Sequence, residues 1–175
     1  MAQQKPAEKM ECLRTGETCM TEIKIRRMTP KDASVAAALE RECFSEAWSE
    51  NAYLSTLMNE DAIYLAAETE SGELAGVCGV LDILGEGDIS NVAVAAAFRR
   101  QKIAERMLAE LLKRGKERGI TAFTLEVRAS NRAAIRLYEK FGFVPEGRRK
   151  NFYTKPVEDA LILWYRCTES DRSVR

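Results

Sequence analysis

The stretch that organises this chain is NVAVAAAFRRQKIAERMLAELLKRGKER, residues 91–118. A run rich in β-branched residues, 89–94, leads into a short turn with two arginines. From 100 to 118 the apolar residues then recur every three or four positions, which predicts an amphipathic helix. At such a junction, unpaired backbone N–H groups and the positive helix end converge and favour a phosphate. The alternative is an ordinary connection with solvated arginines.

The flanking segments alternate between strands and helices. The expected strands are residues 23–26, 62–68, 74–84, 89–94, 122–127, 143–148 and 160–165. The expected helices are 30–43, 50–58, 100–118 and 132–141, with Ser49 and Asn131 as N-caps and with Gly119 and Gly142 as stops. This order indicates one α/β domain, with a central mixed β-sheet and helices on both faces.

Composition narrows the class of protein. The chain has 175 residues, of which 46% are apolar and 31% are charged, as in one ordinary globular domain. Lys plus Arg and Asp plus Glu both number 27, so we expect neither nucleic acid nor a membrane as a partner. The polar N-terminal region lacks a secretory signal, which favours the cytoplasm.

Three segments are expected along the chain. Residues 1–20 have no helical or strand periodicity and are expected to form a disordered extension. Residues 21–167 would form the domain, and 168–175 a C-terminal tail. The sequence leaves the oligomeric state open, a monomer included.

The chain contains no histidine, which excludes Ser-His-Asp, Cys-His and HExxH chemistry. Acid–base chemistry must therefore come from Glu, Asp, Tyr, Lys or Cys. The five cysteines have scattered spacings and form no CxxC pair, so we expect neither a disulfide framework nor a metal site. Cys43 and Cys78 are expected to be small core residues.

Two residues are candidates for proton transfer. Glu126 lies between apolar neighbours in an expected strand, where partial burial would raise its pKa towards that of a useful general base. The alternative is a carboxylate on a wet sheet face, paired with a cation. Tyr138 has helical spacing typical of core packing, but its hydroxyl could also donate a proton.

These segments together resemble the GCN5-related N-acetyltransferase (GNAT) superfamily from residue 23 to residue 166. RRQKIA, residues 99–104, is similar to its pyrophosphate-binding motif R/Q-x-x-G-x-G/A. Residues 131–143 are similar to its signature N-x-x-A-x-x-x-Y-x-x-x-G-F. The resemblance implies the GNAT acyl-CoA N-acyltransferase fold, with acetyl-CoA as the acetyl donor and no metal.

The resemblance also implies roles for single residues. Glu126 would be the general base, and Tyr138 would protonate the departing thiolate. Acetyl-CoA would lie along the strand at 92–94 and on the amides that follow. The implied contacts are Val92, Ala93, Val94, Arg100, Gln101, Lys102, Ile103, Ala104, Glu105 and Asn131.

Lys102 departs from the family pattern, because it stands where the motif usually has its first glycine. A glycine there allows the backbone to approach the pyrophosphate closely. If Lys102 is already helical, its side chain can point outwards and its ammonium can favour the phosphate charge. We therefore expect acetyl-CoA to bind with micromolar affinity.

Four further stretches resemble GNAT members that acetylate the N-terminal alanine of a small-subunit ribosomal protein. They are residues 43–49, 125–131, 148–153 and 158–160. This resemblance implies that such a protein N-terminus is the acceptor. The implied contacts are Phe44, Trp48, Asn151 and Tyr153.

The acceptor assignment has alternatives. Phe44 and Trp48 could instead form a hydrophobic contact between the first two helices. The basic run 148–150 could be either a rim that steers an acidic partner or a solvated hairpin end. Other acceptors would be another protein N-terminus or a small amine such as a polyamine or aminoglycoside, although the basic run argues against polycations. A non-catalytic acyl-CoA-binding or ribosome-docking module is the remaining alternative.

Overall fold

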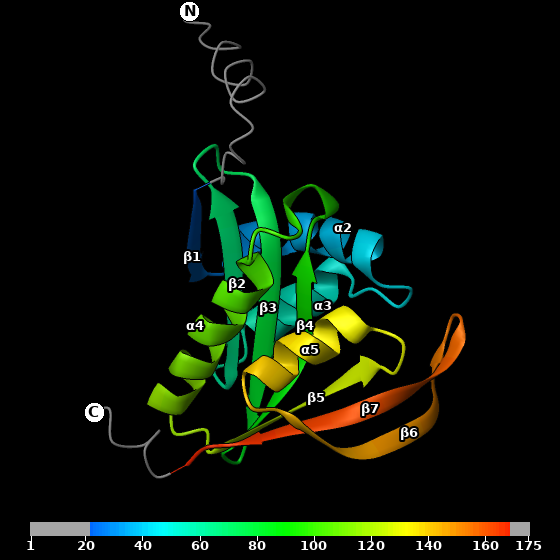
Figure 1. Cartoon of the computed structure of the whole chain (residues 1–175). Coiled ribbons are helices and arrows are strands. Elements are labelled where there is room, and N and C mark those ends of the chain that lie inside the picture. The colour runs from blue at the N-terminus through cyan, green and yellow to red at the C-terminus, as the bar shows by residue number, and fades with distance from the viewer. Residues whose placement is uncertain (1–21, 169–175) are drawn as a thin grey trace, which may run out of the picture.

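The computed structural model describes residues 22–168, in which seven strands form one mixed sheet (Figure 1). The strands are β1 (Ile23–Arg27), β2 (Ala62–Thr69), β3 (Leu74–Ile83), β4 (Glu86–Val94), β5 (Ala122–Arg128), β6 (Val144–Thr154) and β7 (Val157–Arg166). Their order across the sheet is β1-β2-β3-β4-β5-β7-β6. Strands β4 and β5 run parallel, and the other neighbours are antiparallel. The predicted mixed sheet is confirmed.

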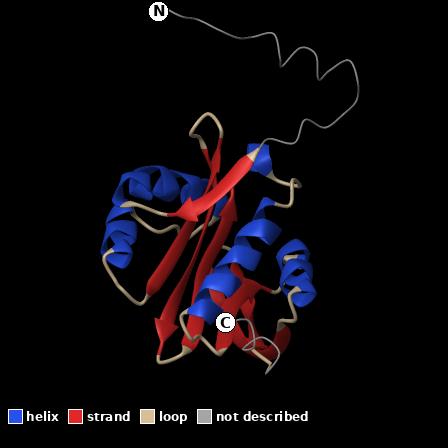
Figure 2. Cartoon of the chain, turned by 90° about the vertical axis from the view of Figure 1, so that its left-hand side faces the viewer, coloured by secondary structure: helices blue, strands red, loops and turns tan. Residues whose placement is uncertain are grey.

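Helices cover both faces of the sheet, as predicted (Figure 2). They are η1 (Pro30–Asp32), α2 (Ala33–Cys43), α3 (Glu50–Leu57), η2 (Ala96–Phe98), α4 (Ile103–Glu117) and α5 (Arg132–Lys140). Helices α2 and α3 pack on one face, and α4 and α5 on the other. No helix within residues 22–168 is long and apolar enough to cross a membrane. The expected extension 1–20, and all but the first residue of the expected tail 168–175, lie outside the described residues.

The predicted helix ends are formed by the expected residues. The Ser49 hydroxyl accepts a hydrogen bond from the backbone N–H of Ala52 at 3.2 Å, and Asn131 Oδ1 accepts one from Ala134 at 3.1 Å. Gly119 and Gly142, with φ of 97° and 86°, terminate α4 and α5 in the left-handed conformation that glycine adopts most easily.

Four predicted boundaries are wrong by three or more residues, and one of them is the start of β7, which is Val157 and not residue 160. Helix α4 begins at Ile103, not at residue 100, because the preceding turn uses left-handed backbone. Strand β4 begins at Glu86, since that residue pairs with both β3 and β5. Strand β6 continues to Thr154, not 148, because pairing with β7 maintains it through two irregularities in register.

The core has one layer on each side of the sheet. Under α4 and α5, Met107, Leu111 and Phe123 are fully buried. Cys78 joins this layer with no exposed surface, as predicted, whereas Cys43 is only half-buried. The layer under α2 and α3 is rich in alanine and contains the buried tyrosines Tyr53 and Tyr64.

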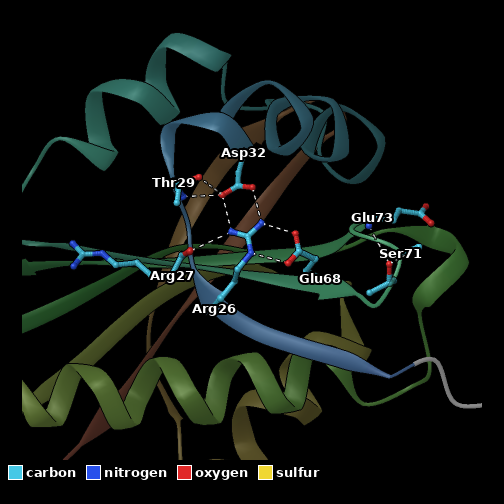
Figure 3. A network of polar contacts seen from close by, with 8 residues as sticks. Arg26, Arg27, Thr29, Asp32, Glu68, Ser71 and Glu73 are labelled. Carbon is cyan, nitrogen blue, oxygen red and sulfur yellow. Dashed lines mark hydrogen bonds and ion pairs between the residues drawn. The ribbon is translucent and has the colours of Figure 1, made fainter.

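A network of charges joins the first strand to the first helical turn (Figure 3). The Arg26 guanidinium donates to both carboxylate oxygens of Asp32 at 2.8 Å and to both oxygens of Glu68, at 2.8 and 2.9 Å. Asp32 also accepts from the backbone N–H of Thr29 at 2.7 Å. The hydrogen bonds from Arg26 lower the pKa of Asp32 to about 2.

We expect Asp32→Asn to destabilise the fold at pH 7 by on the order of 1 kcal/mol, because it removes the ion pair with Arg26. The folded-state pKa of Asp32, about 2, lies below its ordinary value of 3.8. Its contribution is therefore complete above about pH 4 and is lost as the pH falls towards 2. Thermal melts from pH 7 to pH 2.5 should show a flatter acid limb for Asp32→Asn. Asp61→Asn, at an exposed carboxylate, should keep the wild-type limb.

Candidate active site

The sheet opens between its two parallel strands. Strands β4 and β5 are paired only at Glu86–Ala122, Gly87–Phe123 and Asp88–Thr124 within the described chain. Beyond these pairs β4 continues along β3, and β5 continues along β7. The two strands diverge in Figure 1, where α5 lies in front of the opening. We call this opening the β4–β5 gap; it leaves one edge of β4 without a strand partner.

A pocket of about 290 Å³ lies where β4 ends and α4 begins. It is lined by Val94, Phe98, Arg99, Arg100, Lys102, Ile103, Ala104, Glu105 and Leu137. Six residues predicted to contact a cofactor therefore meet around one cavity, whereas Phe98, Arg99 and Leu137 were not predicted.

The other predicted contact residues have different surroundings. Asn131 caps α5, and Ala93 points into the opposite core layer. Val92 packs against the core under α4 and α5. The side-chain oxygen of Gln101 is buried and has no hydrogen-bond partner among residues 22–168. A buried oxygen of this kind calls for an external donor, such as water or a bound molecule.

Glu126 lies beside the gap on β5, on the sheet face covered by α2 and α3. Leu125 and Val127 alternate with it and are buried on the other face. Its Oε1 accepts a hydrogen bond from Arg149 Nη1 at 2.7 Å, and its side chain is 29% exposed. Oε2 has no hydrogen-bond partner in the described part of the chain. The Tyr153 hydroxyl donates to the backbone carbonyl of Glu126 at 3.4 Å.

Tyr138 lies on the opposite face, where α5 packs against the sheet. Its side chain is buried, and its ring centroid is 5.7 Å from that of Phe143. Burial raises its pKa well above the ordinary value of 10, so the phenol keeps its proton at neutral pH. Tyr153, which contacts Glu126, also contributes to this rise. The two candidate proton-transfer residues thus lie on opposite faces of the sheet.

The arrangement of these parts agrees with that of a known family. The family model described as "Acetyltransferase (GNAT) family" matches residues 34–143, well over half of the chain. The chain belongs to the GNAT family. As a GNAT protein it is an N-acetyltransferase, and members of the family use acetyl-CoA.

Relatives from bacteria cover most of this GNAT chain. A protein of Bacillus subtilis (strain 168), provisionally named a ribosomal protein bS18-alanine N-acetyltransferase, is 35% identical over 150 residues, which cover 85% of this chain and 99% of the relative. The ribosomal protein bS18-alanine N-acetyltransferase (RimI) of Escherichia coli (strain K12) is 34% identical and covers 79% of this chain and 94% of its own. The crystal structure of the Escherichia coli ribosomal-protein-S18-alanine N-acetyltransferase superposes with a TM-score of 0.77 at 29% identity, covering 88% and 99%.

Lys102 takes an unexpected conformation within the GNAT pyrophosphate motif. Our expectation that the motif tolerates Lys102 assumed a helical residue. Lys102 is instead left-handed, with φ 60° and ψ 17°, and directly precedes α4. Arg100 is also left-handed, with φ 63°. The chain therefore keeps a backbone conformation that suits glycine while it carries a lysine side chain.

We expect Lys102→Gly to stabilise the fold by about 1 kcal/mol, because glycine has no Cβ to oppose the left-handed backbone. For a chain of this size, that gain raises the melting temperature by about 2–4 °C. Lys102→Ala is the matched control, since it removes the charge but keeps the Cβ. Equal melting temperatures for the two variants would contradict the assignment of strain.

The loop between α2 and α3 lies against the β6–β7 hairpin. The Ser45 hydroxyl accepts from Arg128 at 3.0 Å, and Glu46 accepts from the Thr154 hydroxyl. Trp48 packs on Tyr64, with ring centroids 5.8 Å apart. These contacts join two segments that are about a hundred residues apart in the sequence.

The four residues that were predicted to contact the acceptor do not all lie together. Tyr153 lies next to Glu126, and its ring stacks under the Arg128 guanidinium at 4.1 Å. Phe44 is 39% exposed, and Asn151 is exposed, with its backbone N–H bonded to Asp159. The alternative of a purely structural role fits Trp48 best, since its ring packs into an aromatic cluster.

A buried carboxylate that sequence reasoning missed anchors this loop. Glu40 is 1% exposed and accepts hydrogen bonds from the Trp48 backbone N–H and the Tyr53 hydroxyl, both at 2.8 Å. It also accepts from the side-chain amide of Asn91 on β4. The sequence did contain a signal for this buried carboxylate, since Glu40 lies among alanines and Leu39 on the apolar face of α2.

The basic run 148–150 is neither a hairpin end nor a free basic rim. Its residues lie within β6, before the hairpin turn. Arg148 pairs with Asp159 at 2.6 Å, and Arg149 pairs with Glu126 at 2.7 Å. Two of the three cations are thus neutralised by carboxylates of the neighbouring strands, which weakens the predicted long-range steering of an acidic partner.

Proposed function

We propose that this enzyme is an Nα-acetyltransferase that acetylates the N-terminal alanine of a small-subunit ribosomal protein. The observation that carries the proposal is Glu126, a carboxylate at the side of the β4–β5 gap with one oxygen that has no hydrogen-bond partner within residues 22–168. The names of the Bacillus subtilis and Escherichia coli relatives support this choice of acceptor. A ribosomal acceptor also implies that the enzyme works in the cytoplasm.

The residues of the donor side fit acetyl-CoA. The unpaired edge of β4, including Val92 and Val94, offers backbone groups to the amides of a pantetheine arm, as an added strand would. Arg100 and Lys102 bring positive charge to the start of α4, where free N–H groups favour a diphosphate. The partnerless oxygen of Gln101 lies in the same turn. Bound acetyl-CoA would supply an activated acetyl group.

The protein must deprotonate the acceptor before it can react. An α-amino group has an ordinary pKa of about 7.7–8.0, so much of it is protonated at neutral pH. Glu126 would accept a proton through its free oxygen, directly or through a water molecule. Tyr138, whose raised pKa keeps the phenol protonated, would donate a proton to the departing sulfur. No covalent enzyme intermediate and no histidine are required.

The acceptor peptide would lie between the α2–α3 loop and the β6–β7 hairpin. Phe44 and Trp48 would border it on one side, and Asn151 and Tyr153 on the other. Aromatic walls with a few polar groups suit an extended peptide. Because Arg128 and Glu46 already join the loop to the hairpin, this surface is organised before the peptide binds.

The test compares acceptors in one thiol-release assay. The enzyme is incubated with acetyl-CoA and with peptides that start with Ala, Ser or Met, alongside spermidine. Preferred turnover of an alanine peptide with the bS18 N-terminal sequence supports the proposal, and comparable turnover of spermidine would favour a small-amine acetyltransferase. Calorimetry should detect acetyl-CoA binding at micromolar affinity, and its absence would overturn the donor assignment.

A further inference from the structure

Asp88 is a second carboxylate at the gap. It forms the last residue pair between β4 and β5, opposite Thr124. On its other side it pairs with Leu81 of β3, which packs in the core layer under α2 and α3. Because directly paired residues project to the same face, Asp88 shares the sheet face of Thr124 and, by alternation along β5, of Glu126.

The Asp88 carboxylate is partly buried and has no hydrogen bond or ion pair within residues 22–168. Its charged and titratable neighbours come from two strands. Glu126 faces it from β5, and Tyr64, whose hydroxyl donates to Ser90, faces it from β2. Arg149 and Tyr153 of β6 lie beyond it, in contact with Glu126.

These surroundings make Asp88 a better proton acceptor than an exposed aspartate. Burial, followed by the negative charge of Glu126, raises the pKa of Asp88 above its ordinary value. Arg149 donates a 2.7 Å hydrogen bond to Glu126, whereas no cation contacts Asp88 in the described chain. The two carboxylates therefore share one face of the gap but differ in their partners, since only Glu126 has a cation beside it.

The proposed reaction removes two protons from the acceptor nitrogen. An ammonium nitrogen loses one proton before it can attack and a second when it becomes an amide nitrogen. We propose that Asp88 takes one of these protons and Glu126 the other, so that the gap contains a pair of carboxylates rather than a single general base. This inference rests on the proposed amine acetylation and refines it, because Asp88 takes the proton that is lost before the attack and Glu126 takes the proton that is lost during it.

The steps balance. In the first transfer, an N–H bond of the ammonium breaks and an O–H bond forms on Asp88, which leaves a neutral amine. The nitrogen then bonds to the thioester carbonyl carbon as the C–S bond breaks. Its surplus proton passes to Glu126, and Tyr138 donates its phenolic proton to the sulfur. One carboxyl proton returns to Tyr138 and the other leaves to solvent, so the products are one amide, one thiol and one proton.

The kinetic test uses Asp88→Asn, with Glu86→Gln as the matched control. Glu86 is an exposed carboxylate two residues earlier on the same strand. With the alanine peptide as acceptor, Asp88→Asn should lower kcat/KM at least tenfold and shift the acidic limb of the pH–rate profile, while acetyl-CoA binding stays unchanged. Asp88→Glu should recover part of the rate. A pH–rate profile and rate for Asp88→Asn that match those of Glu86→Gln would overturn the proposal.

A titration separates this inference from the proposed function. Carbon-13 NMR of the Asp88 carboxyl in the free enzyme should give a pKa above that of an ordinary aspartate, and Glu126→Gln should lower it. An Asp88 pKa that is insensitive to Glu126→Gln would refute the pair. Because the titration needs no acceptor, it tests the pair of carboxylates even if the wild type turns over none of the peptides. A lack of turnover would count against the proposed function alone.

Discussion

Glu126→Gln is expected to reduce acetyl transfer by about 10²- to 10⁴-fold, the usual contribution of a positioned base. The substitution keeps the size of the side chain but removes the ability to accept a proton at neutral pH. Its carboxylate lies on the sheet face covered by α2 and α3, and Glu126 does not line the pocket at the start of α4. Acetyl-CoA affinity, measured by calorimetry, should therefore stay close to that of the wild type.

The control for this variant is Glu146→Gln. Glu146 of β6 also pairs with an arginine, Arg166, but it lies near the far end of the hairpin from the gap. Loss of an exposed ion pair alone typically changes stability by less than about 1 kcal/mol. If both variants kept the wild-type kcat, Glu126 would be only a structural partner of Arg149.

Tyr138→Phe is expected to reduce turnover by about 10²- to 10⁴-fold, because the departing sulfur would lose its proton donor. The ring would remain packed against Phe143, so the fold should be preserved. The readout is single-turnover acetyl transfer, which separates the chemical step from product release. Acetyl-CoA affinity should change little, since the variant loses only one hydroxyl.

Tyr165→Phe provides the comparison for Tyr138→Phe. Tyr165 packs against the same Phe143 and pairs with Phe123, where β4 and β5 are joined, and its hydroxyl accepts from Lys116. Its loss should leave the transfer rate within a few-fold of wild type. Equal rate losses in the two variants would indicate a packing effect instead of proton donation by Tyr138.

Features set by neighbouring residues could be predicted from the sequence. Ser49 and Asn131 cap their helices and Gly119 ends α4, because each interaction spans only a few residues. The start of α4 could not be predicted, since the apolar spacing continues through a turn in which Arg100 and Lys102 are left-handed. Strand β6 was underestimated because its exposed, charged residues lack alternation and depend on β7 for pairing.

The candidate site was predictable as a list of residues but not as a set of contacts. The motifs identified Glu126, Tyr138 and the turn before α4. The ion pair between Glu126 and Arg149, and the common sheet face of Glu126 and Asp88, depend on strand order and register. These are set by the whole sheet, and no local spacing encodes them.

The short pairing between β4 and β5 has a consequence for how the molecule opens. Only three residue pairs join the β1–β4 half of the sheet to the β5–β7 half within residues 22–168. In the free enzyme, amides on the open edge of β4 should exchange hydrogen for deuterium faster than those shared with β3. A ligand that bridges the opening would slow that exchange and couple the two halves, so substrate occupancy would itself protect the protein from heat and proteases.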